Sequence, residues 1–234
     1  MSNTNLKNMK KIITVANPIG GTAKTTTAHA ISVAAAEYGR KVLLIDADPK
    51  ATLTCNLGVE NPRATLLEVS KGQVSLELAI LRTSERFDFL ASSARTINFA
   101  GHLNIGGLAD YELTVIDTPS NYSTGYKKLL NIADLIIAPC DGSINAARGV
   151  QLLSDFVDDK SKIKLLTLNW NNSDAATAYQ QLLAKQFSAI DTQINMANPQ
   201  LFAMGSLKHI HAISIEKGSQ LGSEYRELTY FLLN

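Results

Sequence analysis

The sequence predicts an α/β fold in which a mostly parallel sheet carries helices on both faces. Short apolar segments alternate with segments of helical pattern along most of the 234 residues. Near-continuous apolar strands are typical of parallel sheets that are buried on both sides. Acidic residues directly follow two of these segments, at the strand ends where such sheets bind ligands. The sequence therefore predicts a site along one edge of the sheet.

The expected strands and helices follow one another in a regular order. Strands are expected at residues 11–16, 41–45, 87–91, 113–116, 133–139 and 163–168. Helices are expected at residues 25–38, 65–71, 75–81, 144–156, 175–187 and 223–233. A further helix is expected after the strand 113–116, with its end at residue 131. The chain has no internal repeat and no break in composition. We expect one domain over residues 1–234, with residues 1–10 flexible.

Charge and cysteine content restrict the class of protein. The 22 basic and 21 acidic residues nearly cancel, so a nucleic-acid surface has to be a local patch. Cys55 and Cys140 are far apart and have no metal-ligand spacing, which indicates reduced thiols in the cytosol. No apolar run approaches the roughly 20 residues that span a bilayer. We expect a cytoplasmic protein.

The segment between the first strand and the first helix has the features of a phosphate-binding loop. Phosphates require converging backbone N–H groups, a helix N-terminus and a lysine. The eight residues from Ile19 to Thr26 (IGGTAKTT) supply all three. Pro18 and Ala23 stand where the ordinary G-x-x-x-x-G-K-[ST] motif has glycines, so by itself the segment also fits an ordinary connection.

Three aspartates complete a nucleotide site at the same edge of the sheet. Asp46 and Asp48 follow the second strand, and Asp117 directly follows the expected strand 113–116. A nucleoside triphosphatase needs Mg²⁺ on the β- and γ-phosphates, a hydroxyl such as that of Thr25 on the metal, and carboxylates around it. A capped turn before Pro49 is the alternative for the first two aspartates. Together with the loop, the aspartates predict a P-loop NTPase.

Three segments resemble the ParA/MinD family of deviant Walker-box ATPases. Residues 17–26 resemble its N-Q-K-G-G-x-x-K-T-T loop, residues 42–54 its V-L-L-V-D-x-D-P-Q-x-x-x-T segment, and residues 115–119 its I-I-D-x-P strand end. Residues 60–110 are not covered. The resemblance implies weak Mg²⁺-dependent hydrolysis of ATP by an ATP-dependent homodimer.

The resemblance also implies roles for the loop residues. Lys24 would hold the β- and γ-phosphates, Thr25 would ligate Mg²⁺, and Thr26 would contact the α-phosphate. Backbone N–H groups would come from Gly20, Gly21, Thr22 and Ala23. We expect alanine to be tolerated at position 23, because a methyl group is harmless where the backbone is near-helical.

Four further residues receive roles from the resemblance. Asp46 and Asp48 would position the attacking water and support the metal shell, and Asp117 would bind Mg²⁺ through water. Thr25, Asp46 and Asp117 are therefore the expected metal residues. Asn169, at the end of a late strand, matches the position that contacts the adenine ring.

Ile19 departs from the family pattern. The family has a signature lysine there, which reaches the partner's nucleotide, whereas isoleucine cannot donate a hydrogen bond. Arg148 is the substitute we favour for this catalytic role, since the equivalent stretch lies on the family's dimer face; a solvated arginine is the alternative. Other candidates are Lys50, Lys127 and Lys128.

The resemblance implies a switch that partitions or positions a cargo on the nucleoid. The cargo would be a plasmid, a chromosome region or a protein compartment such as a carboxysome, and an adaptor of the ParB or McdB type would stimulate slow hydrolysis. The McdA type also lacks the signature lysine. Two alternatives remain open, namely an ATP-bound scaffold with little hydrolysis and a P-loop kinase with an acceptor pocket within residues 60–110.

The sequence also bears on DNA and membrane partners. The candidate basic residues for non-specific DNA, with a solvated face as the alternative, are Lys160, Lys162, Lys164, Lys208, His209, His211 and Lys217. A membrane-binding helix needs basic residues beside its apolar face, and residues 224–234 offer only Arg226. We expect that segment to pack on the domain and the protein not to bind membranes.

Overall fold

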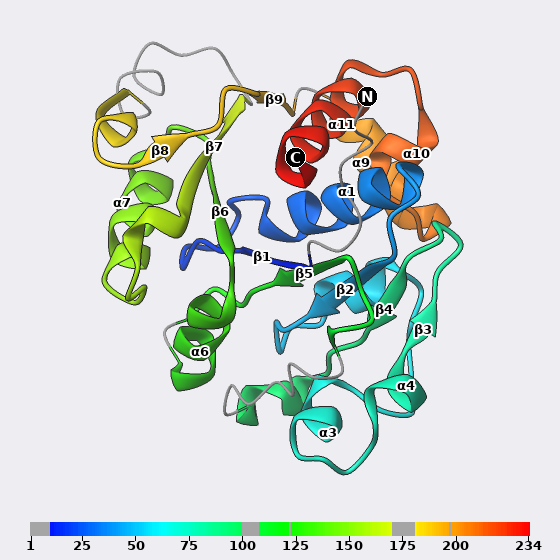
Figure 1. Cartoon of the computed structure of the whole chain (residues 1–234). Coiled ribbons are helices and arrows are strands. Elements are labelled where there is room, and N and C mark those ends of the chain that lie inside the picture. The colour runs from blue at the N-terminus through cyan, green and yellow to red at the C-terminus, as the bar shows by residue number, and fades with distance from the viewer. Residues whose placement is uncertain (1–9, 100–107, 122, 170–180, 197) are drawn as a thin grey trace, which may run out of the picture.

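A mostly parallel sheet forms the centre of the molecule (Figure 1). The computed structural model describes residues 10–99, 108–121, 123–169, 181–196 and 198–234. The strand order is β3-β4-β2-β5-β1-β6-β7-β8, with β9 paired to β7. Among the strands in these described ranges, only β3 and β4 pair in antiparallel orientation. The predicted fold class is confirmed.

The long strands lie in the middle of the sheet. They are β1 (Lys11–Val15), β2 (Val42–Asp46), β4 (Asp88–Leu90), β5 (Leu113–Asp117), β6 (Leu135–Cys140) and β7 (Ile163–Asn169). Three strands of two residues each complete it, namely β3 (Leu81–Arg82), β8 (Ser188–Ala189) and β9 (Ile194–Asn195).

Helices connect the strands and cover the sheet. The longer ones are α1 (Lys24–Glu37), α6 (Thr124–Ile132), α7 (Ile144–Ser154), α9 (Pro199–Lys208) and α11 (Gln220–Leu233). The shorter ones are α2 (Thr52–Asn56), α3 (Leu66–Ser70), α4 (Leu76–Ala79), α10 (Ala212–Ile215), and the 3₁₀ helices η1 (Ala94–Asn98) and η2 (Lys160–Lys162).

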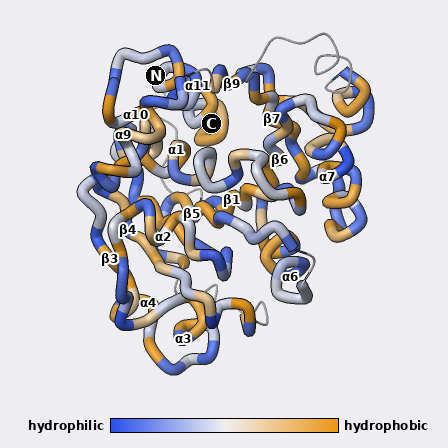
Figure 2. Tube along the Cα trace, turned by 180° about the vertical axis from the view of Figure 1, so that it is seen from behind, coloured by the Kyte–Doolittle hydropathy of each residue, from blue (hydrophilic) through white to orange (hydrophobic). Residues whose placement is uncertain are grey.

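Alternate residues of the central strands face two separate layers of helices. Val15, Leu44 and Val115 belong to a core that they share with α1 and α11. Ile45 and Ile116 point the other way, into a core completed by α3, α4 and α6. The hydropathy-coloured trace shows the apolar residues concentrated along these inner strands (Figure 2).

Helix α1 is buried on nearly all sides because its side chains are small. Alanine predominates in its second half, which lets α11 pack closely against it. Two polar contacts fix this pair: the hydroxyls of Thr27 and Tyr225 lie 3.2 Å apart, and Arg226 Nε donates to Glu37 at 2.7 Å. The helix that starts at the phosphate loop is thereby held in place along its length.

The strand register brings the predicted site residues together. β5 lies between β1 and β2, with Val15 and Asp46 both opposite Asp117. Parallel strands end at a common edge, so the loop after β1 meets the carboxylates that end β2 and β5.

Several boundaries differ from the prediction. Residue 81 begins a strand, because β3 pairs with β4 and ends the predicted helix 75–81 at Ala79. The last helix begins at Gln220, since Ser219 caps it. The short elements α2, α10, β8 and β9 were not predicted, and neither was α9, although Asn198 and Pro199 are ordinary start signals.

Two predictions fall partly outside the described residues. Of the expected helix 175–187, residues 175–180 lie outside them and residues 181–184 are helical. The expected flexibility of residues 1–10 concerns mainly residues 1–9, which also lie outside. The expectation of a single domain stays a prediction.

Candidate functional site

The phosphate loop is anchored to the neighbouring strand and helix by Asn17. Its Nδ2 donates to the carbonyls of Pro139 (3.0 Å) and Ala146 (3.2 Å), and its Oδ1 accepts from the N–H of Ile19 at 3.1 Å. These partners lie at the end of β6 and in α7. The base of the loop is thus fixed, while Gly20 and Gly21 are exposed at its tip.

Ala23 corrects an expectation. Its φ of 57° and ψ of 28° are left-handed, not near-helical, at the position that caps α1. The chain must turn sharply here to start the helix, and an L residue with a methyl group pays about 1–2 kcal/mol for this conformation. Alanine is therefore present at a position that favours glycine, as Gly21 does at φ 80°.

Lys24 lies folded against the loop. Its Nζ donates to the carbonyl of Ile19 at 3.0 Å and to Ser120 Oγ at 2.8 Å, and only 6% of the residue is exposed. Burial lowers the pKa of Lys24, and the nearby Asp117 and Asp48 partly offset this. The ammonium group is positioned for an anion that enters between the loop and the end of β5.

Thr25 and Asp117 join the first turn of α1 to the end of β5. Thr25 Oγ1 donates to Asp117 Oδ2 at 2.7 Å, and Asp117 Oδ1 is buried without a hydrogen-bond partner among the described residues. Burial raises the pKa of Asp117 well above its ordinary value, and the nearby Asp46 raises it further. A buried free oxygen beside a hydroxyl fits the shell of a divalent cation.

Such a cation would need oxygens from a ligand as well. Within the described residues, no group of three His, Cys, Asp or Glu side chains is placed to hold a metal ion. Mg²⁺ commonly uses one or two protein groups and takes its other ligands from phosphate and water. Thr25 and Asp117 therefore fit a nucleotide-bound Mg²⁺ better than a stand-alone metal site.

Asp46 is engaged more fully than its predicted role suggests. Its Oδ1 accepts from the N–H of Asp48 (3.0 Å), and its Oδ2 accepts from the N–H (3.0 Å) and the hydroxyl (2.7 Å) of Thr54. Burial raises its pKa to about 6, despite the bonds from Thr54 that lower it. Asp46 holds the β2–α2 turn together, while Asp48 is partly exposed and more accessible to a ligand.

Three further predicted site residues lie on α1, β7 and α7. Thr26 is half-buried on α1 and lines a 270 Å³ cavity. Asn169 ends β7, as predicted, and its Nδ2 donates to Gln193 Oε1 at 3.0 Å. Arg148 is exposed on α7 and forms no ion pair with another described residue.

Helix α7 packs directly on the phosphate loop through Gly149. A Cβ at this position would lie 2.0 Å from Asn17 Oδ1 and 2.8 Å from Ile19 Cγ1. Only glycine allows this approach. Arg148 precedes Gly149 in the same helix and lines a separate 330 Å³ cavity with Leu182.

Three residues at the site were not predicted. Ser120 contacts Lys24, Thr54 holds Asp46, and Asn17 anchors the loop. A signal existed for Ser120, which follows the strand-end segment of Asp117. Thr54 stands at the final T of the V-L-L-V-D-x-D-P-Q-x-x-x-T segment, but its contact with Asp46 depends on the unpredicted α2.

His211 is not part of a basic surface, so the prediction that it is a candidate residue for DNA binding is wrong. It is buried, and Glu85 links it to α1: the carboxylate accepts from the His211 N–H at 3.0 Å and contacts His29 Nε2 at 2.6 Å. Burial and the neighbouring His29 hold the pKa of His211 well below its ordinary value. This neutral ring contributes to the core, not to a cationic patch.

Comparisons with known proteins place the chain in a family. Residues 10–106 match the model of the AAA domain family. The maintenance of carboxysome distribution protein A of Synechococcus elongatus is 30% identical over 168 residues, which are 65% of this chain and 66% of that protein. The chain spans only about half to two thirds of the length of such curated relatives. The chain belongs to the ParA/MinD family.

Two solved structures are similar to this chain over most of its length. Cobyrinic acid a,c-diamide synthase from Mycobacterium smegmatis, solved with an ATP analogue and magnesium, has a TM-score of 0.80 at 25% identity and covers 96% of this chain and 94% of its own. The septum site-determining protein MinD from Pyrococcus horikoshii, complexed with Mg-ADP, has a TM-score of 0.78 at 22% identity and covers 96% of both chains. The latter likeness is one of fold, the P-loop NTPase type.

The buried Asp46 makes stability depend on pH in a defined direction. Its folded pKa of about 6 lies above the ordinary 3.8, so the folded state binds the proton more tightly. Its contribution to the free energy of unfolding is full below pH 4 and is lost as pH rises through 6, by about 3 kcal/mol in all.

We expect the difference in unfolding free energy between the natural protein and Asp46→Asn to grow as pH falls from 7 to 4. Denaturant unfolding at several pH values without nucleotide measures it. The variant loses hydrogen bonds at every pH, so the slope is decisive, and a flat difference would contradict the raised pKa.

Proposed function

We propose that this chain is an ATP-dependent dimerising switch that partitions or positions a cargo on the nucleoid in the cytoplasm. The observation that carries the proposal is the pair of hydrogen bonds that join the loop to the end of β5, from Lys24 to Ser120 and from Thr25 to Asp117. That arrangement supports binding of ATP with Mg²⁺, and ParA/MinD proteins are P-loop ATPases. The carboxysome relative supports a positioning role.

Slow hydrolysis is part of the proposal. The side chain at the signature position is that of Ile19, which has only apolar atoms, and removal of a single transition-state donor costs about a hundredfold or more in rate. An adaptor of the ParB or McdB type would then set the turnover. The alternative is a scaffold that dimerises with ATP and barely hydrolyses it, which the same isoleucine supports.

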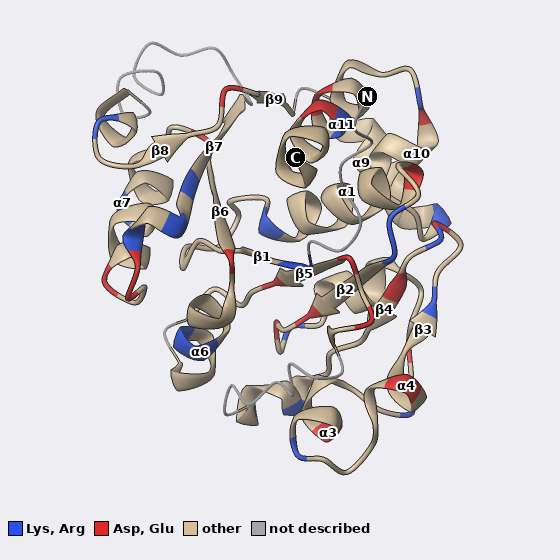
Figure 3. Cartoon of the chain, in the orientation of Figure 1, with Lys and Arg blue, Asp and Glu red and all other residues tan. Residues whose placement is uncertain are grey.

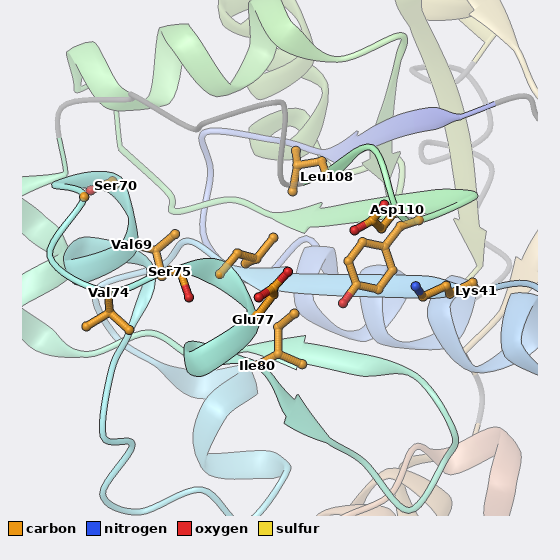
Figure 4. A pocket seen from close by; sticks show the side chains of 12 residues that line it. Lys41, Val69, Ser70, Val74, Ser75, Glu77, Ile80, Leu108 and Asp110 are labelled. Carbon is orange, nitrogen blue, oxygen red and sulfur yellow. The ribbon is translucent and has the colours of Figure 1, made fainter.

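The kinase alternative receives no support from the structure. A 670 Å³ pocket does lie largely within the region where an acceptor site was expected, lined by Val69, Leu76, Glu77 and Ile80 (Figure 4). However, Lys41 and Tyr111 at its rim precede β2 and β5, so the pocket opens at the opposite edge of the sheet. An acceptor bound there could not reach a γ-phosphate held at the carboxyl edge.

Arg148 is the proposed substitute for the signature lysine. Its exposure, on a helix that contacts Ile19 through Gly149, supports a contact with a partner subunit's nucleotide. A guanidinium group is suited to phosphate recognition because its planar donors bind two oxygens at once. The alternative remains a solvated arginine at the surface of α7.

Non-specific DNA binding would rest on a reduced set of basic residues. Lys162 Nζ donates to the carbonyl of Ala133 at 2.8 Å, and His211 is buried, so neither contributes freely. Lys160 and Lys164 lie by β7, whereas Lys208 and Lys217 lie by α9 and α10, on the other side of the molecule (Figure 3). A dimer would be needed to bring such patches onto one DNA surface.

Helix α11 packs on α1, which supports the expectation of no membrane binding. Leu221, Tyr225, Leu228 and Leu232 contribute to the core. Within the part of the chain that the structure describes, no helix has both the length and the apolar character needed to cross a membrane.

The switch proposal predicts that Lys24→Ala weakens ATP binding about a hundredfold and abolishes ATP-dependent dimers, because a buried charged donor is lost. Titration with a fluorescent ATP analogue and light scattering measure the two effects. Lys71→Ala, which removes an exposed lysine after α3, is the control and should change neither.

Absence of ATP binding by the natural protein would contradict the proposal. If the protein forms ATP-dependent dimers but releases no phosphate with any candidate adaptor, the result would support the alternative function of a scaffold.

For Arg148, replacement by alanine should lower hydrolysis or dimer lifetime about tenfold or more while leaving the nucleotide affinity of the monomer unchanged. Single-turnover phosphate release and dimer dissociation rates are the measurements. Gln151→Ala, one turn along the same helix, is the control for surface changes on α7. Equal rates for the natural protein and Arg148→Ala would show that Arg148 is a solvated surface residue with no role in hydrolysis or dimer lifetime.

DNA binding should require ATP and fall steeply with salt, since counterion release drives it. A gel-shift titration between low and physiological salt tests this. Replacing Lys208 and Lys217 by glutamine should reduce the salt slope, and the same change at Lys160 and Lys164 shows which patch is used. Salt-independent or absent binding would remove nucleoid attachment from the proposal.

A further inference from the structure

Ser120 lies at the mouth of the phosphate loop. Its Oγ is 2.8 Å from Lys24 Nζ, and it is the nearest heavy atom to the position that a Cβ on Gly20 would occupy, 4.0 Å away. The residue follows β5 closely, three positions after Asp117. Ser120 therefore faces the loop from the segment that directly follows the strand with the proposed metal carboxylate.

The hydroxyl of Ser120 has a hydrogen to donate. A serine hydroxyl carries one hydrogen and two acceptor positions, and an ammonium group can only donate. The bond with Lys24 therefore occupies an acceptor position and leaves the O–H hydrogen available. No acceptor for it is found among the described residues. The serine can thus bind Lys24 and an anion at the same time.

The position of Ser120 relative to Lys24 and Thr25 indicates which phosphate it would meet. In loops of this kind the lysine reaches the β- and γ-phosphates, and the threonine holds the metal that bridges them. Thr25 is tied to Asp117 at 2.7 Å, so the metal side is next to the end of β5. Ser120, beyond Asp117 along the same chain segment and against Lys24, is on the side of the terminal phosphate.

We propose that Ser120 determines the preference of this chain for a nucleoside triphosphate over a diphosphate, by donating its hydroxyl hydrogen to the terminal phosphate while it accepts from Lys24. The inference rests on the proposed function and deepens it. Ile19 offers that phosphate no donor from its side chain, so a hydroxyl at this place supplies one from within the same subunit.

The test compares the affinities of a non-hydrolysable ATP analogue and of ADP, each with Mg²⁺, for the full chain. Ser120→Ala should weaken binding of the analogue about tenfold and leave that of ADP within about twofold, because only the triphosphate meets the hydroxyl. Ser120→Thr keeps the hydroxyl and should restore most of the difference. Isothermal titration calorimetry measures all of these constants.

Ser123→Ala is the matched control. This serine lies three residues further along the same segment, and its Oγ accepts from the N–H of Tyr126 at the start of α6. Its loss should leave the ratio of the two affinities unchanged. Thermal unfolding of Ser120→Ala without nucleotide should match that of the natural protein.

Each other outcome is informative. Equal weakening of both nucleotides in Ser120→Ala would show that the serine only positions Lys24, and no change would show that it is not used. Tighter binding of the analogue would show that it competes with nucleotide for Lys24. Each of these results would overturn this inference alone. Failure of the natural protein to bind either nucleotide would overturn the proposed function, and this inference with it.

Discussion

The hydrogen bond between Thr25 and Asp117 joins the two parts of the molecule on which the site depends. One partner is in the first turn of the buried helix α1, and the other ends a strand in the middle of the sheet. Asp117 accepts this bond while fully buried, with its second oxygen unpartnered among the described residues. Burial of a carboxylate is costly unless a cation or donors compensate. The unpartnered carboxylate oxygen lies close to Lys24, where a bound nucleotide with its cation would compensate for the free-energy cost of burial.

Much of the fold followed from the sequence because the long strands carry a strong signal. Segments such as that around Leu44 are apolar on both faces, and the pattern does not depend on distant contacts. The two-residue strands β8 and β9 have no such signal, since they exist only through pairing with β7. Helix α2 has only five residues, and Asp46 holds its first turn through Thr54. These elements depend on tertiary contacts that a linear pattern does not contain.

At the site, the sequence predicted which residues come together, but it did not predict the backbone conformation or the burial of every residue. Lys24, Thr25, Asp46 and Asp117 were placed correctly at one edge because motif and strand order agree. The backbone at Ala23 was not, because alanine is common in near-helical conformations and the residue type carries no sign of a positive φ. Likewise, nothing in the sequence around His211 distinguishes it from a surface histidine. Its burial and its contact with Glu85 are visible only in the structure.

The close approach of Gly149 to Asn17 and Ile19 has a mechanical consequence. No side chain separates α7 from the loop at Gly149 itself, and Asn17 bonds the two together at Ala146. A shift of α7 at this point would therefore have to be accompanied by a shift of Asn17 and Ile19.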